Sequence, residues 1–170
     1  WESLEQEFRS SVGTVISRGF GGSGIQDAIH YADRIILPYK PRQIVLYAGD
    51  HELRKGASPA EVLGYFKSFP RRIRTELPRT RIAFISIKPG PKNWAESIKK
   101  QETNRLVRSF CNGDKLLDFI DVWTPMLGTD GKPKPELYVA DQLHLSAAGY
   151  AAWAAAIKPV LAANSRAYYS

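Results

Sequence analysis

An aspartate and a histidine lie three residues apart in the segment VADQLHLSAAGY, which runs from Val139 to Tyr150. Hydrolysis through a nucleophilic hydroxyl needs an imidazole that takes its proton and a carboxylate that fixes the tautomer of that imidazole. The carboxylate of Asp141 can reach Nδ1 of His144 within one turn, which leaves Nε2 for a nucleophile, and Ser146 would cap the helix that follows. Asp141 and His144 thus fit two members of a triad. By spacing alone, ordinary capping and turn contacts are the commoner origin of such a pair.

A glycine-rich segment, RGFGGSG, runs from Arg18 to Gly24. Glycines let a backbone approach a ligand closely and point N–H groups at an anion. The spacing does not match the phosphate-binding loop or the dinucleotide fingerprint. Two interpretations stay open, an oxyanion donor and a simple tight turn. Ser23 is the serine within this turn.

A third polar segment, YAGDHEL (Tyr47–Leu53), leaves a predicted strand directly into charged residues, where a hydrogen-bond donor would be needed. Asp50, His51 and Glu52 together also suggest a metal site. No second histidine is near them in sequence, so we expect no metal.

Apolar runs and helical patterns alternate along the chain. Buried strands are predicted at GTVISRGF (weakly), QIVLYAG, RIAFISIKP and LLDFIDV. Helices are predicted over about 2–9, 25–37, 58–77, 94–110 and 146–162. Ser58, Pro59 and Glu61 form the start signal of the third helix. This alternation predicts an α/β fold with a doubly wound parallel sheet.

The loops that follow the strands are where such folds gather reactive groups, because the carboxyl ends of parallel strands lie at one edge of the sheet. All three polar segments above fall at such positions. The long segment Trp123–His144 has little regular pattern, and loops of that length are usually functional or mobile. From position alone, Lys88–Trp94 and Trp123–Ala140 would wall a substrate cleft.

Composition places few limits on function. A chain of 170 residues predicts one domain, over 1–170. The net charge of +7 is spread over short basic stretches, including Lys99 and Lys100, that suit a solvated surface. Because the sequence contains no nucleic-acid-binding motif, we expect no nucleic-acid partner.

No run approaches the roughly 20 apolar residues of a membrane span. The single cysteine, Cys111, excludes an internal disulfide. Location, cytoplasmic or secreted, and oligomeric state are left open.

The segments RGFGGS, YAGDHEL and DQLHLS, in this order and spacing, resemble the second, third and fifth blocks of the SGNH hydrolases, the GDSL-type esterases and lipases. The resemblance spans about Trp1 to Leu161. It implies a flavodoxin-like, three-layer α/β/α fold with a parallel sheet. It also implies a Ser-His-Asp triad without cofactor or metal, acting on small-molecule esters such as acetylated carbohydrates or lipids.

Carried over position by position, the resemblance makes His144 the general base and Asp141 its orienting partner. Gly22 would supply a backbone oxyanion donor and His51 the side-chain donor. The third block of the family usually reads Gly-x-Asn-Asp, whereas this chain has Gly49-Asp50-His51-Glu52. This departure motivates a second hypothesis, a catalytically decayed protein that binds esters or carbohydrates.

The first block of the family, a strand that ends in the nucleophilic serine, has no counterpart in this sequence. We therefore expect an N-terminally incomplete domain whose serine lies upstream of Trp1. The slot of the missing strand could instead be filled by the C-terminal NSRAYYS or by a second chain. Ser23 is the minority candidate for the nucleophile within the chain.

Overall fold

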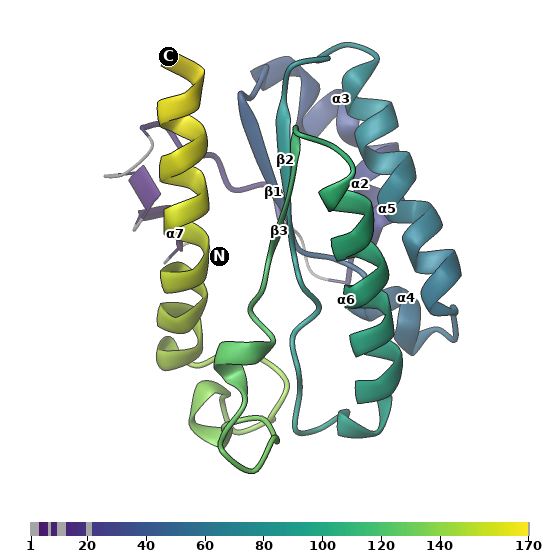
Figure 1. Cartoon of the computed structure of the whole chain (residues 1–170), viewed down its shortest axis with the longest axis vertical. Helices are drawn as coiled ribbons and strands as arrows, with labels where there is room; N and C mark the ends of the chain where they lie inside the picture. The colour runs from purple at the N-terminus through teal and green to yellow at the C-terminus, as the bar shows by residue number, and fades with distance from the viewer. Residues whose placement is uncertain (1–3, 7, 10–12, 20–21, 170) are drawn as a thin grey trace. The chain divides into compact units, whose positions relative to one another are not determined.

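The computed structural model describes residues 4–6, 8–9, 13–19 and 22–169 (Figure 1). The chain forms two compact units. Residues 18–87 and 98–119 make the first, which we call the sheet unit. The second, the C-terminal unit, comprises the described parts of residues 1–17, 88–97 and 120–170. Each unit is described by itself.

Three predicted strands are present in the described part of the chain. They are β1 (Gln43–Leu46), β2 (Arg81–Ile85) and β3 (Leu117–Ile120), in the order β1-β2-β3. β1 and β2 are parallel, with a register that runs from Gln43 opposite Arg81 to Leu46 opposite Phe84. This parallel sheet confirms the predicted α/β class.

The weakly predicted strand at Gly13–Phe20 is wrong for the residues that are described. Residues 14–19 have no regular secondary structure. An extended segment becomes a stable strand only when a neighbour satisfies its backbone groups. The apolar pattern of this short segment was therefore not enough to define a strand.

Five α-helices of the described residues accompany the sheet: α2 (Ile25–His30), α3 (Ala32–Ile35), α4 (Asp50–Arg54), α5 (Pro59–Arg74) and α6 (Ser97–Asn112). The helix predicted over about 25–37 is divided at Tyr31 into α2 and α3, followed by the 3-10 turn η1 (Leu37–Tyr39). The predicted start of α5 is confirmed, because Ser58 Oγ accepts from the N–H of Glu61 and the Glu61 carboxylate accepts from the N–H of Ser58.

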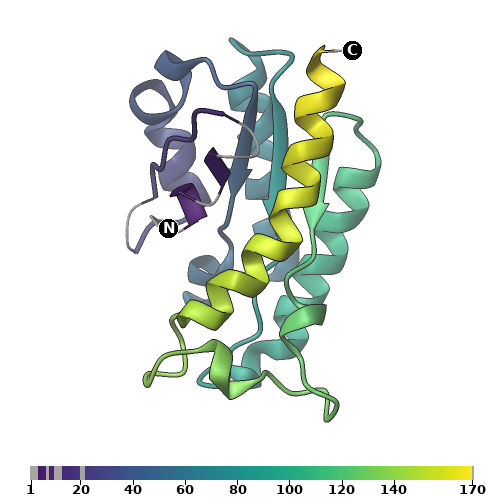
Figure 2. The same ribbon diagram turned by 90° about the vertical axis from the view of Figure 1, so that its left-hand side faces the viewer.

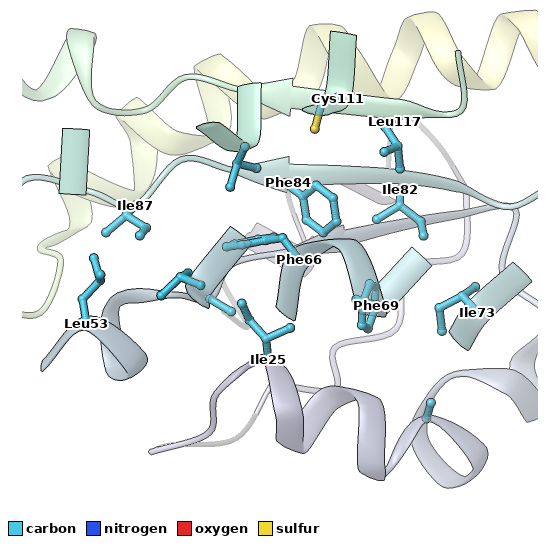
Figure 3. Close-up of a cluster of buried hydrophobic side chains, with 14 of the residues drawn as sticks. Ile25, Leu53, Phe66, Phe69, Ile73, Ile82, Phe84, Ile87, Cys111 and Leu117 are labelled. Atoms are coloured by element: carbon cyan, nitrogen blue, oxygen red, sulfur yellow. The ribbon is translucent and has the colours of Figure 1, made fainter. Parts of the chain in front are cut away.

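One face of the sheet carries the core of the sheet unit (Figure 3). Phe84 of β2 contacts Phe66 of α5 edge-to-face, with 4.9 Å between ring centroids. Apolar side chains of α2, α5, α6 and β3 complete this cluster: Ile25, Val62, Phe69, Ile73, Val107, Cys111 and Leu117. Burying large aliphatic and aromatic side chains stabilises a fold by about 1.5–3 kcal/mol each, so this cluster fixes the helices from which the polar loops start.

Lys100 does not belong to the solvated basic surface that the sequence suggested. Its side chain is 1% exposed, and its Nζ lies 3.1 Å from Oδ1 of Asp50, the first residue of α4. Lys100 follows the same helical spacing as the buried residues Thr103, Val107 and Cys111 of α6. It therefore lies on the buried face of the helix, and a buried ammonium group needs a partner such as Asp50.

The C-terminal unit is built on α7 (Ala147–Tyr169), the yellow helix in Figure 2. The irregular segment before it contains two 3-10 turns, η3 (Thr124–Met126) and η4 (Pro135–Leu137), and η2 (Trp94–Glu96) lies earlier in the chain. The indole N–H of Trp153 in α7 points at the sulfur of Met126, 3.3 Å away. No helix among the described residues has the length and hydropathy to cross a membrane.

We predict that Lys100→Met lowers the free energy of unfolding by about 3–5 kcal/mol, because Asp50 is left in the interior without its cation. The measurement is urea denaturation followed by circular dichroism. Lys99→Met is the matched control, since Lys99 is exposed, and should change stability by less than about 0.5 kcal/mol. Asp50→Asn should recover part of the loss in the Lys100→Met background. Equal stability of the two lysine variants would contradict the buried pair.

Candidate active site

The segment Val139–Leu145 folds into a tight turn in the C-terminal unit. The N–H of Val139 donates to the carbonyl of His144, and the N–H of Gln142 donates to the carbonyl of Val139. Gln142 has a φ of 55°, a left-handed conformation that few non-glycine residues adopt. The chain thus reverses direction between Asp141 and His144.

This reversal brings the side chains of Asp141 and His144 together. Oδ2 of Asp141 lies 2.5 Å from Nδ1 of His144, while Oδ1 accepts from the backbone N–H groups of Leu143 and His144. The imidazole is 76% exposed and the carboxylate 40% exposed. Because Asp141 occupies Nδ1, Nε2 is the ring nitrogen that can take a proton from another group. The ring points into solvent and not into apolar packing.

The same contacts lower the pKa of the Asp141 carboxyl well below its ordinary value. The largest cause is the hydrogen bond from the side chain of His144, followed by the backbone N–H groups of His144 and Leu143. All three favour the ionised form. The stabilisation is thus complete above the ordinary carboxyl pKa of about 3.9 and is lost as the pH falls through the lowered pKa.

Neighbouring elements of the same unit hold the turn in place. Ser146 caps α7, as predicted, because its Oγ accepts from the N–H of Gly149. A Cβ at Gly149 would lie 2.2 Å from the carbonyl oxygen of Leu137, so only glycine lets the first turn of α7 approach this loop. The N–H of Lys92 donates to the carbonyl of Gln142, which places the segment 88–97 beside the turn.

The glycine-rich segment belongs to the sheet unit, where residues 22–24 precede α2. Gly22 is exposed and has a φ of +72°, a conformation that favours glycine. Ser23 is half-buried. Gly24 is buried, and its N–H donates to the carboxylate of Asp27. The open positive-φ turn leaves room for a ligand beside the backbone of Gly22.

His51 lies in the first turn of α4 and is half-buried. The turn before it is tight, because Gly49 has a φ of +104° and a Cβ there would lie 2.9 Å from Cδ1 of Ile87. β1 ends at Leu46, so only a few residues separate the strand from the imidazole. His51 is thus placed at the carboxyl end of β1, where the sequence predicted a donor.

Sequence reasoning missed two residues that support this end of the sheet, buried Glu52 and half-buried Asn104. Glu52 is 8% exposed, and its Oε1 accepts from the N–H of Ile25, 2.6 Å away. The side-chain amide of Asn104 in α6 bonds both the N–H and the carbonyl of Ile87, just beyond β2. Glu52 was considered only as part of a metal cluster. Helical spacing could have placed Asn104 close to the buried face of α6, beside Thr103. Nothing in the sequence identified Ile87 as the partner of its side chain.

Asp50, His51 and Glu52 do not converge on a common point. Asp50 contacts Lys100, and Glu52 bonds the backbone of Ile25. In the described part of the chain no group of three or more His, Cys, Asp or Glu side chains is arranged to hold a metal ion.

A comparison with protein families identifies the family of the chain. Residues 1–152 match the model of the GDSL-like Lipase/Acylhydrolase family. The chain belongs to this family. Hydrolysis of esters is the general chemistry of this family. A search of the curated proteins finds no match.

Solved structures support the same fold. A GDSL-like lipase from Bacteroides thetaiotaomicron is 20% identical with a TM-score of 0.75, over 95% of this chain and 81% of that one. A carbohydrate esterase family 3 protein from Talaromyces cellulolyticus is 13% identical with a TM-score of 0.76, over 96% and 89%. A catalytic mutant of an acetylxylan esterase from Geobacillus stearothermophilus is 14% identical with a TM-score of 0.76, over 94% and 78%. The likeness confirms the predicted fold class of this GDSL-like chain.

We predict that His144→Ala raises the pKa of Asp141 while leaving it below about 3.9, because the two backbone N–H donors remain. Carbon-detected NMR titration of the carboxyl groups measures this shift. Asp114 is the internal control, since its pKa is lowered chiefly by Arg74 and should not change. An identical Asp141 titration in the parent and the variant would mean that the imidazole does not bond the carboxylate in solution.

Proposed function

We propose that the chain is a serine-dependent esterase in which His144 is the general base and Asp141 orients it. The observation that carries this proposal is the 2.5 Å contact between Asp141 Oδ2 and Nδ1 of an exposed imidazole. An aspartate with a purely structural role would need only the hydrogen bonds that its Oδ1 accepts from the two backbone N–H groups. Fixing the tautomer of an exposed ring adds little to folding, but it prepares Nε2 to accept a proton.

In the proposed reaction, Nε2 of His144 removes the proton from a serine hydroxyl as that oxygen attacks the ester carbonyl. The tetrahedral intermediate collapses when the imidazolium gives this proton to the leaving alcohol, and an acyl-enzyme forms. His144 then takes a proton from water as the water oxygen attacks the acyl carbonyl, and it returns this proton to the serine oxygen as the carboxylic acid leaves. Asp141 stays ionised throughout and stabilises the imidazolium.

The negative oxygen of the intermediate needs donors, and we assign them to the N–H of Gly22 and the ring of His51. The open turn at Gly22 and the place of His51 at the carboxyl end of β1 support these roles. A neutral imidazole donates one hydrogen bond, as the asparagine usual in this block does. Its ring is larger, so its reach differs.

We place the nucleophilic serine upstream of Trp1, in a strand beside β1. In the described residues β1 is hydrogen-bonded to a single strand, β2, and all four of its residues are only half-buried. A further strand at that edge would bury them and deliver its own carboxyl end next to that of β1. Ser23 is the alternative nucleophile within the chain, but it occupies the same turn as the Gly22 donor.

For the substrate we propose a small-molecule ester, either an acetyl group on a carbohydrate or an acyl group of a lipid. Structures of a carbohydrate esterase, an acetylxylan esterase and a GDSL-like lipase all share the fold, so both classes stay in the proposal. The segment 88–97 lies beside the histidine turn, and Trp94 stacks there on Trp123 with 5.9 Å between ring centroids. Trp123 is buried, whereas Trp94 is half-buried, and we propose that the face of Trp94 contacts a sugar ring or an acyl chain.

We predict that the full-length natural polypeptide hydrolyses p-nitrophenyl acetate and that His144→Ala reduces the rate to background. Asp141→Asn should reduce kcat by about 10³–10⁴, because the amide stabilises the wrong tautomer of His144. His30→Ala is the matched control, since His30 is an exposed histidine of α2, and it should leave the rate unchanged. Equal rates for His144→Ala and the parent would refute the esterase.

The second candidate is a decayed ester- or carbohydrate-binding protein, which the histidine at position 51 favours. His51→Asn separates the two. If the imidazole is a working donor of poor reach, His51→Asn raises kcat, and His51→Ala lowers it by about 10²–10³. A decayed protein would bind the ester in an equilibrium assay yet give no turnover as the parent or as either variant. An unchanged or lower rate for His51→Asn would assign the ring another role.

A further inference from the structure

Two acidic residues flank His51, and neither side chain is at the surface. Glu52 contacts the start of α2, whereas Asp50 contacts Lys100. We propose that Glu52 is a positioning residue that holds the Gly22–Gly24 turn at a fixed distance from His51. The inference rests on the proposed function, because it concerns the two oxyanion donors.

The bond from Ile25 to Glu52 is the direct link between the two donor segments. Oε1 of Glu52 accepts from the N–H of Ile25 at 2.6 Å, across 27 positions of sequence. Ile25 is fully buried and Glu52 is 8% exposed, so water does not compete effectively for this bond. A charge-assisted bond to a buried amide is among the stronger hydrogen bonds in proteins. His51 directly precedes the acceptor, and Gly22 lies three residues before the donor.

Gly24 shows how closely the turn is seated on this carboxylate. A Cβ at Gly24 would lie 2.3 Å from Oε1 of Glu52, much closer than any real contact. Gly24 has a φ of −111°, which other residues adopt readily. Its lack of a side chain therefore serves the close approach of Glu52 and not the backbone conformation.

The acceptor is itself anchored. The N–H of Ala57 donates to the carbonyl of Glu52, which closes the end of α4. At the other end, Asp50 is paired with buried Lys100 of α6. The backbone of α4 is thus held at both ends, which restricts where the carboxylate of Glu52 can lie. Its second oxygen, Oε2, is buried and has no hydrogen-bond partner among the described residues.

We therefore assign to Glu52 a role through the position of its acceptor oxygen. Displacing reacting groups by about 1 Å can cost 10²-fold in rate. Glu52→Ala should therefore lower kcat by about 10²-fold and leave KM within about three-fold of the parent. Glu52→Gln keeps an acceptor oxygen at the same reach and should retain most activity. Glu52→Asp keeps the charge but is one methylene too short, and it should lose activity nearly as Glu52→Ala does.

A double-mutant cycle with Gly24 tests the contact itself. Gly24→Ala in the parent pushes the carboxylate away and should lower kcat about as much as Glu52→Ala. In the Glu52→Ala background the space is open, so Gly24→Ala should cost little more. Additive losses would mean that the two residues act separately and would overturn the proposal.

Glu61 supplies the matched control for a merely structural carboxylate. It accepts from the N–H of Ser58 at 2.7 Å and so holds the start of α5, as Glu52 holds the start of α2. Glu61→Ala should lower thermal stability and leave kcat unchanged. If Glu52→Ala behaves in the same way, the positioning role is wrong.

Hydrogen exchange of the Ile25 amide gives a readout that does not depend on turnover. It should be slow in the parent, fast in Glu52→Ala and slow again in Glu52→Gln. Fast exchange in the parent would overturn the link, and fast exchange with unchanged kcat in Glu52→Ala would overturn its catalytic role. If Glu52→Ala does not fold, the other two variants test the positioning role. A higher kcat for Glu52→Gln than for Glu52→Asp supports this role. The reverse order would contradict it and would indicate that the charge of Glu52 matters. A parent with a protected Ile25 amide but no ester hydrolysis would refute the proposed function, and the positioning role with it, while leaving the link itself intact.

Discussion

A lysine ammonium group buried in the first turn of α6 is the constraint on which one end of the sheet unit depends, the end proposed to carry the oxyanion donors. The free energy of removing Lys100 from water can be recovered only through a close anion, and Asp50 supplies it from the first residue of α4. This pairing requires α6 and the carboxyl end of β1 to stay together. Asn104, one turn further along α6, adds two bonds to Ile87 beyond the end of β2. One helix thus fixes the ends of two neighbouring strands.

The two parts of the candidate site are held by different kinds of contact. Asp141 and His144 form a local unit, because the hydrogen bonds of the Asp141 carboxylate all go to residues two or three positions later in the chain. Both side chains are partly or mostly in solvent. The donor segments instead depend on long-range contacts in a low-dielectric interior, from Glu52 to Ile25 and from Lys100 to Asp50. A general base must exchange protons, so solvent access suits it. Oxyanion donors must not reorganise during the reaction, so buried contacts behind the proposed donor segments suit that role.

This difference explains how much the sequence could predict. The Asp141–His144 pair, the Ser146 cap and the capping box at Ser58 are encoded within a few residues, and all three were predicted correctly. The three strands of the parallel sheet were predicted from continuous apolar runs, which are typical of strands buried on both faces, although only β2 is almost fully buried among the described residues. The weak strand at residues 13–20 was wrong in its described part, since its pattern alone did not supply a partner.

The buried polar contacts could not be predicted, because they join positions that are far apart in the chain. Nothing local marks Glu52 as the acceptor for Ile25, 27 positions away. Lys100 was assigned to the surface on composition, although its spacing with Thr103 and Val107 places it on the buried face of α6. Lysine is usually exposed, and this general tendency was given more weight than the helical spacing. For Lys100 the helical spacing predicts the burial correctly.

The departure of this chain from the usual Gly-x-Asn-Asp block can be understood as a change of size and not as a loss of pattern. Both altered positions carry a longer side chain of related chemistry: a ring donor at His51 in place of an amide, and a carboxylate at Glu52 with one more methylene. The longer carboxylate is not idle, because it bonds Ile25 and is matched by the absence of a side chain at Gly24. The buried acid, its amide partner and the glycine depend on one another, since an unpaired buried carboxylate or amide costs stability. The altered block thus keeps a defined geometry at the carboxyl end of β1, with Glu52 as the residue that joins α4 to the start of α2.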